Sequence, residues 1–148
     1  MDNLYKSAMR EQLRQLQEEL LEIQTMLADK GYLSAIAYRA AERNLQLLVE
    51  ACIGIAKQSL KAEGLEVPSD ARQSFAKLKS LGLDPTDISW TKVVGMRNAL
   101  VHDYFNLDPE RISEVIANGH YLKLFVKCYS DPHLSSLLIS ATSPVSAV

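Results

Sequence analysis

Apolar residues recur along the N-terminal part of the chain with the alternating spacing of four and three that is typical of one face of an α-helix. Within residues 2–29 this spacing predicts one long amphipathic helix, and Gly31 is placed to end it. Residues 33–62 repeat the pattern and predict a second long helix packed lengthwise on the first. Almost every position from residue 47 to residue 56 is apolar, so we expect this helix to be central and covered on several sides. The positions that set the spacing are Met9, Leu13, Leu16, Leu20, Ile23 and Leu27 in the first helix and Ala41, Leu45, Leu48, Cys52 and Ile55 in the second.

Shorter helical segments follow. Ser69 is a suitable N-cap for a helix over residues 70–81. Asp84-Pro85 predicts the start of the next helix, because proline is favoured at the first helical position. For the same reason Asp108-Pro109 predicts a final main helix over residues 109–129.

The whole pattern predicts an all-α protein of about five helices, because no segment has the strict alternation of a half-buried strand. The 148 residues are enough for one domain with a single core, which we assign to residues 1–130. Residues 131–148 have no charged side chain after Asp131, and we expect a C-terminal tail that is partly disordered.

Composition adds little to this picture, since 47% hydrophobic and 23% charged residues are ordinary for a globular protein. The formal net charge of −2 does not favour nucleic-acid binding by the chain as a whole. Any such contact must come from a local basic patch. Lys6, Arg10 and Arg14 recur every four residues, either as such a patch or as an ordinary solvated helix face.

The two cysteines, Cys52 and Cys128, lie in apolar helical patterns, and we expect buried thiols and no disulfide. No CxxC motif or histidine cluster predicts a metal site, and no cofactor is expected. The N-terminus lacks the apolar core of a signal peptide, and no apolar run approaches the ~20 residues of a membrane span. We therefore expect a cytoplasmic protein.

The candidate chemistry lies in the stretch from Arg97 to Tyr104, where the helical pattern ends. At ~100° per residue, Arg97 and His102 differ by ~140° in direction and by ~7.5 Å along the axis. One straight helix therefore does not direct both side chains at a single atom. Either a local break in the helix or a second copy of the chain across a two-fold axis would bring such groups together.

An arginine and a histidine suit the cleavage of a phosphodiester. A histidine such as His102 can accept or donate a proton, while Arg97 offers a planar, permanently charged donor group to phosphate oxygens. In RNA the nucleophile is already present as the 2′-hydroxyl, so this pair needs no metal. The alternative is structural, with His102 capping a helix C-terminus and Arg97 forming a salt bridge.

Polar residues also interrupt the second helix. Arg39, Arg43 and Glu50 share one stripe, and buried polar groups need partners. The stripe is either an Arg43–Glu50 or inter-helix ion pair, or a wall beside the Arg97/His102 cleft in which Glu50 orients an arginine. Trp90 is either a core residue, which its pattern favours, or a base-stacking residue at the cleft edge.

The segment from Val93 to Phe105, VVGMRNALVHDYF, resembles the signature of the HEPN superfamily and in particular of its HepT toxin branch. That signature has arginine, four residues, histidine, one residue and tyrosine, and every fixed position is filled here. A second segment, Arg39 to Ala56, resembles the second helix of HepT proteins. It departs from them at Gly54, where an acidic residue is more usual.

The resemblance covers roughly residues 1–130 and implies an up-and-down helical bundle that forms a two-fold dimer, with the two motifs in one cleft. It implies metal-independent RNA cleavage by a toxin of a toxin–antitoxin pair. Arg97 and His102 are then the catalytic pair, with Asn98 and Asp103 as supporting polar residues.

The resemblance also implies a partner, an MntA-like antitoxin related to minimal nucleotidyltransferases. Such an antitoxin transfers AMP from ATP to the motif tyrosine, here Tyr104. Two alternatives of other classes remain. One is a non-catalytic helical subunit that binds a substrate or nucleotide for a nucleotidyltransferase, and the other is a plain structural bundle.

Overall fold

A computed structural model describes residues 1–102 and 108–135 of the chain. Every regular element among them is an α-helix, which confirms the predicted fold class. None of these helices combines the length and apolar character needed to cross a bilayer. The elements are α1 (Asn3–Lys30), α2 (Ala35–Ala62), α3 (Ala71–Ser80), α4 (Trp90–Val101), α5 (Pro109–Asn118) and α6 (Leu122–Tyr129), and residues 132–135 are also helical.

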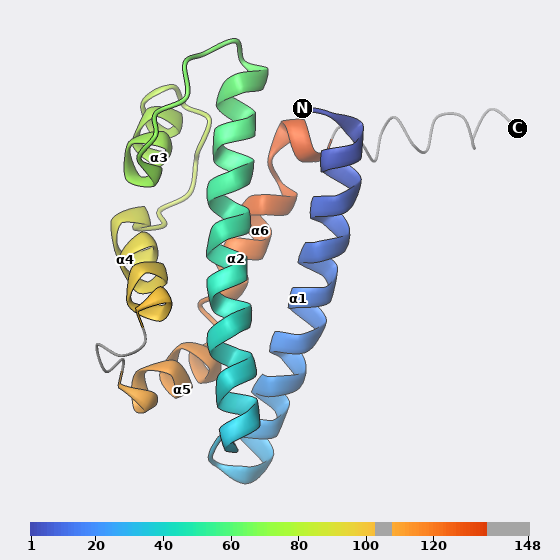
Figure 1. The fold of residues 1–148 in the computed structure, drawn as a ribbon, viewed down its shortest axis with the longest axis vertical. Helices are drawn as coiled ribbons and strands as arrows, with labels where there is room; N and C mark the ends of the chain where they lie inside the picture. Colours follow the sequence, from blue (N-terminus) through green and yellow to red (C-terminus); the bar gives the residue numbers. More distant parts are fainter. Residues whose placement is uncertain (103–107, 136–148) are drawn as a thin grey trace, which may run out of the picture.

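The two long helices lie side by side as an antiparallel pair, as their spacing predicts (Figure 1). The Asp2 carboxylate caps α1, and Gly31 ends it in the left-handed region at φ 79°. The Ser34 hydroxyl caps α2. In contact with each of the other five helices, α2 is the central element of the bundle, also as predicted.

The predicted helix over residues 109–129 is wrong, because the segment forms two helices. Gly119 adopts φ 70°, which ends α5, and α6 begins at Leu122 after a short turn. A glycine within a helical pattern is compatible with either outcome. The break lets both helices pack on α1 and α2, with Ile116 from α5 and Phe125 from α6 fully buried.

A smaller difference concerns α3. Its N-cap is Asp70, whose side chain accepts hydrogen bonds from the backbone N–H groups of Arg72 and Gln73, and not the expected Ser69. Both residue types cap helices well, so the sequence alone does not choose between adjacent candidates.

Beyond residue 130, the chain continues into the same core. Leu134 has no exposed surface. The buried Asp131 carboxylate accepts a hydrogen bond from the Ser59 hydroxyl of α2 (2.6 Å) and from the N–H groups of His133 and Leu134. The tail expected at residues 131–148 otherwise lies outside the described residues, which end at 135.

The cysteines are buried free thiols, as expected. Their sulfur atoms lie 3.2 Å apart, although the two cysteines are 76 positions apart in the sequence. The contact with Cys128, together with burial, raises the pKa of Cys52 well above its ordinary value. The contact between the two sulfur atoms therefore joins α2 to α6.

Near the start of α1, the Tyr5 hydroxyl is buried and has no hydrogen-bond partner among the described residues. Burial, with a smaller effect of Cys128 and Asp131, raises the pKa of Tyr5 to about 12. The hydroxyl fits against Gly54 of α2, where an added Cβ would lie 3.0 Å from it. A side chain at position 54 would therefore require the Tyr5 hydroxyl to shift.

We expect Tyr5→Phe to raise the free energy of unfolding by about 1 kcal/mol, because it removes a buried donor that has no hydrogen-bond partner among the described residues. Gly54→Ala gains helix propensity but collides with the hydroxyl. It should therefore stabilise the Tyr5→Phe protein more than the wild type. Urea unfolding of the four proteins measures both effects, and equal effects of Gly54→Ala in the two backgrounds would contradict this packing.

Candidate active site at the C-terminal end of α4

The N-terminal end of α4 is fixed by a buried carboxylate. The indole Nε1–H of Trp90 donates a hydrogen bond to Asp84 Oδ2 (2.7 Å), and Asp84 Oδ1 accepts from the hydroxyl and the N–H of Thr86. The Trp90 ring also stacks on Phe75 of α3, with ring centroids 3.9 Å apart and planes 2° apart. Trp90 is therefore a core residue, and the alternative of a base-stacking role is wrong.

These contacts correct the predicted start of the helix at Asp84-Pro85. The Asp84 side chain organises a turn through Thr86 instead of capping a helix, and α4 begins at Trp90. Burial acts to raise the pKa of Asp84. The hydrogen bonds from Thr86 and Trp90, with the nearby charge of Lys127, outweigh burial and hold this pKa below its ordinary value. The carboxylate is thus ionised while it anchors α4.

Further along, some apolar residues of α4 are buried and others are exposed. Trp90, Val94 and Leu100 are buried against the rest of the bundle. Met96 remains partly exposed, and Val101 at the C-terminal end is 46% exposed. Within the described residues α4 contacts only α2 and α3, so part of its apolar surface faces outward.

Of the predicted catalytic residues, Arg97 lies in the last two turns of α4 and is half-buried. Its Nε donates a hydrogen bond to the side-chain oxygen of the neighbouring Asn98 (2.9 Å). It forms no salt bridge with any acid of residues 1–102 or 108–135. Its terminal guanidinium nitrogens are therefore not committed to a carboxylate there.

His102 is the residue at which α4 ends. Its backbone leaves the helical region at φ −107° and ψ 58°, while its N–H still donates to the Asn98 carbonyl (3.2 Å). The residue is exposed. The straight-helix geometry therefore does not extend beyond Val101. The other two motif residues of the prediction, Asp103 and Tyr104, lie outside the described residues.

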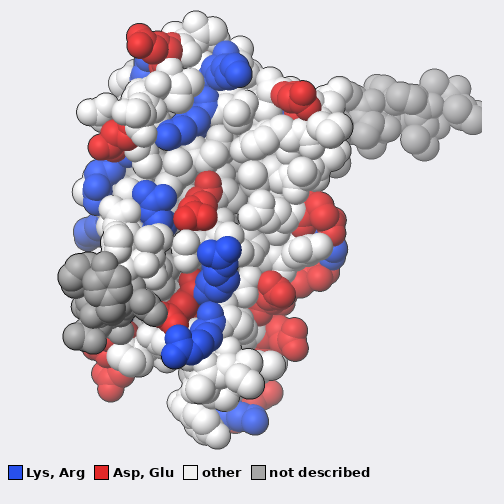
Figure 2. All heavy atoms as spheres, in the orientation of Figure 1, with Lys and Arg blue, Asp and Glu red and all other residues white. Residues whose placement is uncertain are grey.

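Beside α4, the polar stripe of α2 is open to solvent. Arg43 is exposed and Glu50 is half-buried, with Glu50 Oε1 accepting a hydrogen bond from Gln46 Nε2 (3.2 Å). No salt bridge joins Arg43 to Glu50 in the described chain. Figure 2 shows positive and negative side chains interspersed over α2 on this face. Gln46 is the residue of this stripe that sequence reasoning missed, and its i,i+4 spacing from Glu50 is the signal that would have found it.

Gly54, the departure from the HepT pattern, is turned away from α4. Its missing side chain faces Tyr5 of α1. An acidic residue at this position would point into the contact between the two long helices and not toward Arg97.

The other polar groups that the sequence singled out serve the fold. Arg14 lies between Glu11 and Glu18 in exposed ion pairs, and the Arg10 guanidinium lies 5.7 Å from the centre of the Tyr129 ring. Lys6 is 8% exposed. The possible basic patch on α1 is therefore not a free cationic surface.

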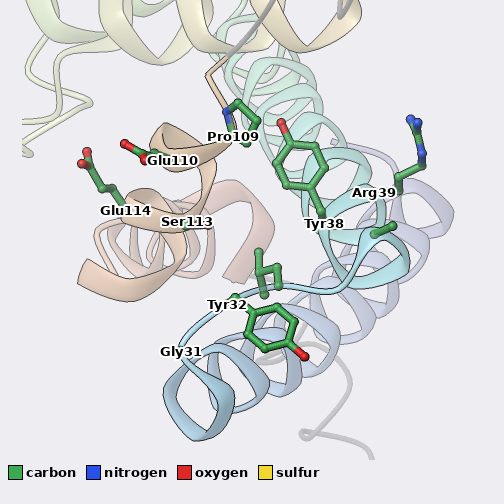
Figure 3. A pocket seen from close by; sticks show the side chains of 10 residues that line it. Gly31, Tyr32, Tyr38, Arg39, Pro109, Glu110, Ser113 and Glu114 are labelled. Atoms are coloured by element: carbon green, nitrogen blue, oxygen red, sulfur yellow. The ribbon is translucent and has the colours of Figure 1, made fainter.

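A hollow of about 600 Å³ lies between the α1–α2 turn and α5 (Figure 3). The Tyr38 ring lies toward Pro109, and Arg39 points away from Glu110 and Glu114. With one arginine and two glutamates among its lining residues, this hollow has no excess of cations for a phosphate. In the described part of the chain, no group of three or more His, Cys, Asp or Glu side chains is arranged to hold a metal ion.

Fold and site together define a class of protein: an all-helical bundle with an arginine and a histidine five positions apart at the end of a surface helix. The chain belongs to the Ribonuclease HepT-like family, whose model matches residues 4–128. It is 37% identical over 84 residues to the mRNA nuclease HepT of Shewanella oneidensis. That match covers 55% of this chain and 62% of the relative, less than two thirds of its length. No solved structure matches the chain.

We expect Trp90→Phe to lower the free energy of unfolding by about 1.5–3 kcal/mol near neutral pH, because it removes a hydrogen bond to a buried ionised group. Circular dichroism during urea unfolding measures the loss, since Trp90 is the only tryptophan. In a double-mutant cycle, the effects of Trp90→Phe and Asp84→Asn on the free energy of unfolding should be strongly non-additive.

The pH dependence has a definite sign. The pKa of Asp84 is lower in the folded state than its ordinary value of 3.8. The ionised carboxylate therefore contributes to the free energy of unfolding above pH 3.8, and this contribution is lost as the pH falls through the folded-state pKa. The stability difference between wild type and Asp84→Asn should therefore shrink below about pH 3.8. Additive effects, or a difference that does not change with pH, would contradict this anchor.

Proposed function

We propose that the protein is an endoribonuclease of the HepT type and the toxin of a toxin–antitoxin pair, in which Arg97 and His102 cleave RNA without a metal ion. The observation that carries the proposal is the family match across the whole motif, joined to the position of both residues outside the core. The relative's name gives mRNA as its substrate, and we extend the substrate class, RNA, to this chain.

In the proposed reaction, His102 accepts the proton of a ribose 2′-hydroxyl while that oxygen attacks the adjacent phosphorus and the bond from phosphorus to the 5′-oxygen breaks. The products are a 2′,3′-cyclic phosphate and a 5′-hydroxyl, whose oxygen takes a proton from water, and the protonated His102 then returns its proton to water. Arg97 stabilises the negative charge that builds on the non-bridging oxygens. The Asn98 side chain holds Nε of Arg97, which leaves its terminal nitrogens for the phosphate. Asp103, Arg43 and Glu50 are proposed as supporting residues of the same site.

A homodimer completes this site. Arg97 lies within α4 and His102 lies where α4 ends, so a second copy of the chain packed on this end would add a second pair of these residues to the same surface. Val101, an apolar residue 46% exposed beside His102 at the end of α4, is suited to contact a second copy. Two-fold symmetry would then bring two Arg97/His102 sets into one cleft.

We expect the purified protein to cleave RNA in excess EDTA and His102→Ala to lower the rate at least about 100-fold, as the loss of a general base does. Arg97→Ala should cause a similar loss. His133→Ala is the matched control, because this histidine pairs with Glu63 away from α4. Gel analysis of labelled RNA measures cleavage.

Before this assay, mass spectrometry must show that Tyr104 carries no AMP. A dimeric, unmodified protein that cleaves no RNA pool would contradict the nuclease. It would favour the alternative function, a helical subunit that binds a substrate or nucleotide for a partner nucleotidyltransferase.

We further propose that an MntA-like nucleotidyltransferase neutralises the toxin by transferring AMP to Tyr104. Each AMP adds a phosphodiester charge that Arg97 can bind in place of the RNA phosphate, since phosphate and guanidinium pair strongly. The nucleotide would also fill space that the substrate needs.

We therefore expect Tyr104→Phe to keep RNA cleavage but to escape neutralisation, because phenylalanine has no hydroxyl to modify. Growth of cells that express the variant with and without the antitoxin measures this. Tyr32→Phe, which removes an exposed hydroxyl at the α1–α2 turn, is the control and should remain under antitoxin control. Protection of cells that express Tyr104→Phe would contradict the proposal.

A further inference from the structure

A second hollow, of about 530 Å³, lies between α4 on one side and α5 and α6 on the other. It exists because α4 packs on α2 and α3 alone, within the described residues, and leaves a groove beside α5 and α6. The floor is apolar and includes Met96 from α4, Val115 from α5 and Leu124 from α6. We call this hollow the α4–α6 groove.

The charged residues of the groove are mostly cationic. Lys92 of α4, Arg111 of α5 and Lys123 of α6 line it, against the single carboxylate of Asp87. All three cations are exposed, and none forms a salt bridge with a described residue. This local excess stands out in a chain with 16 basic and 18 acidic residues, and it contrasts with the hollow of Figure 3.

The three cations come from three different helices, so they are brought together by the fold and do not belong to one basic stretch of the sequence. Uncommitted cations around an apolar floor are what a single-stranded nucleic acid requires, because its phosphates need cations and its unstacked bases need apolar surface. The cations would also attract an acidic peptide, but a peptide has no unstacked bases to place on the apolar floor.

The groove is also close to the candidate active site along α4. Met96 is adjacent in sequence to Arg97, and Lys92 lies five residues before Arg97, ~7.5 Å along the helix axis. The two surfaces are neighbouring sides of one helix, whose full diameter is ~10–12 Å. A strand a few nucleotides long can therefore reach from one to the other.

We infer that the α4–α6 groove binds the single-stranded RNA that flanks the cleavage site, with phosphates at Lys92, Arg111 and Lys123 and a base against the apolar floor. The inference rests on the proposed function for the identity of the nucleic acid. It assigns substrate affinity to a surface separate from Arg97 and His102, so that the two can be altered independently.

The test compares two triple variants with the same change in charge. The groove variant is Lys92→Glu/Arg111→Glu/Lys123→Glu, and the control is Lys30→Glu/Lys61→Glu/Lys79→Glu, which reverses three exposed lysines of α1, α2 and α3. Both are made in the His102→Ala background, and circular dichroism checks the fold. Fluorescence anisotropy then measures the binding of a labelled single-stranded RNA of about twelve nucleotides at several salt concentrations.

We expect the groove variant to bind RNA at least tenfold more weakly than the control. The slope of log affinity against log salt should fall by about 2, since each phosphate contact on a single strand contributes about 0.7. With His102 intact, the groove variant should raise KM and leave kcat within a few-fold. Single reversals keep the test decisive if a triple variant does not fold.

Equal loss of affinity in the two triple variants would overturn the inference, because it would reflect net charge alone. Unchanged RNA binding with loss of binding to the antitoxin would also overturn it and assign the groove to an acidic protein. Failure of the nuclease is distinguishable: groove-dependent RNA binding without cleavage by the unmodified wild type contradicts the proposed function and leaves the groove intact.

Discussion

The burial of α2 is the constraint on which the rest of the structure depends. Its apolar residues face α1 on one side and the four shorter helices on others, so α1, α3, α4, α5 and α6 are all placed by contact with it. The stripe that stays polar, with Arg39, Arg43, Gln46 and Glu50, cannot be covered without desolvating its charges. The helix that forms the centre of the bundle therefore also determines which of its faces, the one with this polar stripe, stays open to solvent.

The motif helix α4 is held asymmetrically against this centre. At its start, an ionised carboxylate, an indole N–H and a stacked aromatic pair fix Trp90. At its end, Val101 and His102 are exposed. The attachment at its start positions α4 in the fold. The exposed end leaves His102 accessible to another molecule.

Two sets of cations in this chain differ in what lies next to them. Arg10 and Arg14 are used within the fold, against an aromatic ring and two carboxylates, although their spacing in the sequence resembles a binding stripe. Lys92, Arg111 and Lys123 show no such spacing, yet three helices bring them around one groove. Charge in the sequence is thus a poor guide to which cations remain available to a ligand, because availability depends on what lies next to each side chain.

The sequence by itself determined the helical class, the two long helices and the central place of α2. Their apolar spacing is sustained over many turns, and only a helix with one buried side produces it. It also determined the motif stretch, through residue types at a fixed spacing. Short signals were ambiguous: Asp84-Pro85 fits a helix start as well as a turn, and Gly119 fits a helix interior as well as a break.

Only the tertiary structure decided these cases, because the deciding contacts join different elements. Phe75 of α3 stacks on Trp90, whose indole N–H donates to Asp84, and the break at Gly119 accompanies the packing of α5 and α6 on α1 and α2. The Cys52–Cys128 contact, the fit of Tyr5 against Gly54 and the α4–α6 groove likewise join residues from different helices. Periodicity reports which side of a helix is buried, but not which atoms bury it, and the identity of those atoms decides the local chemistry.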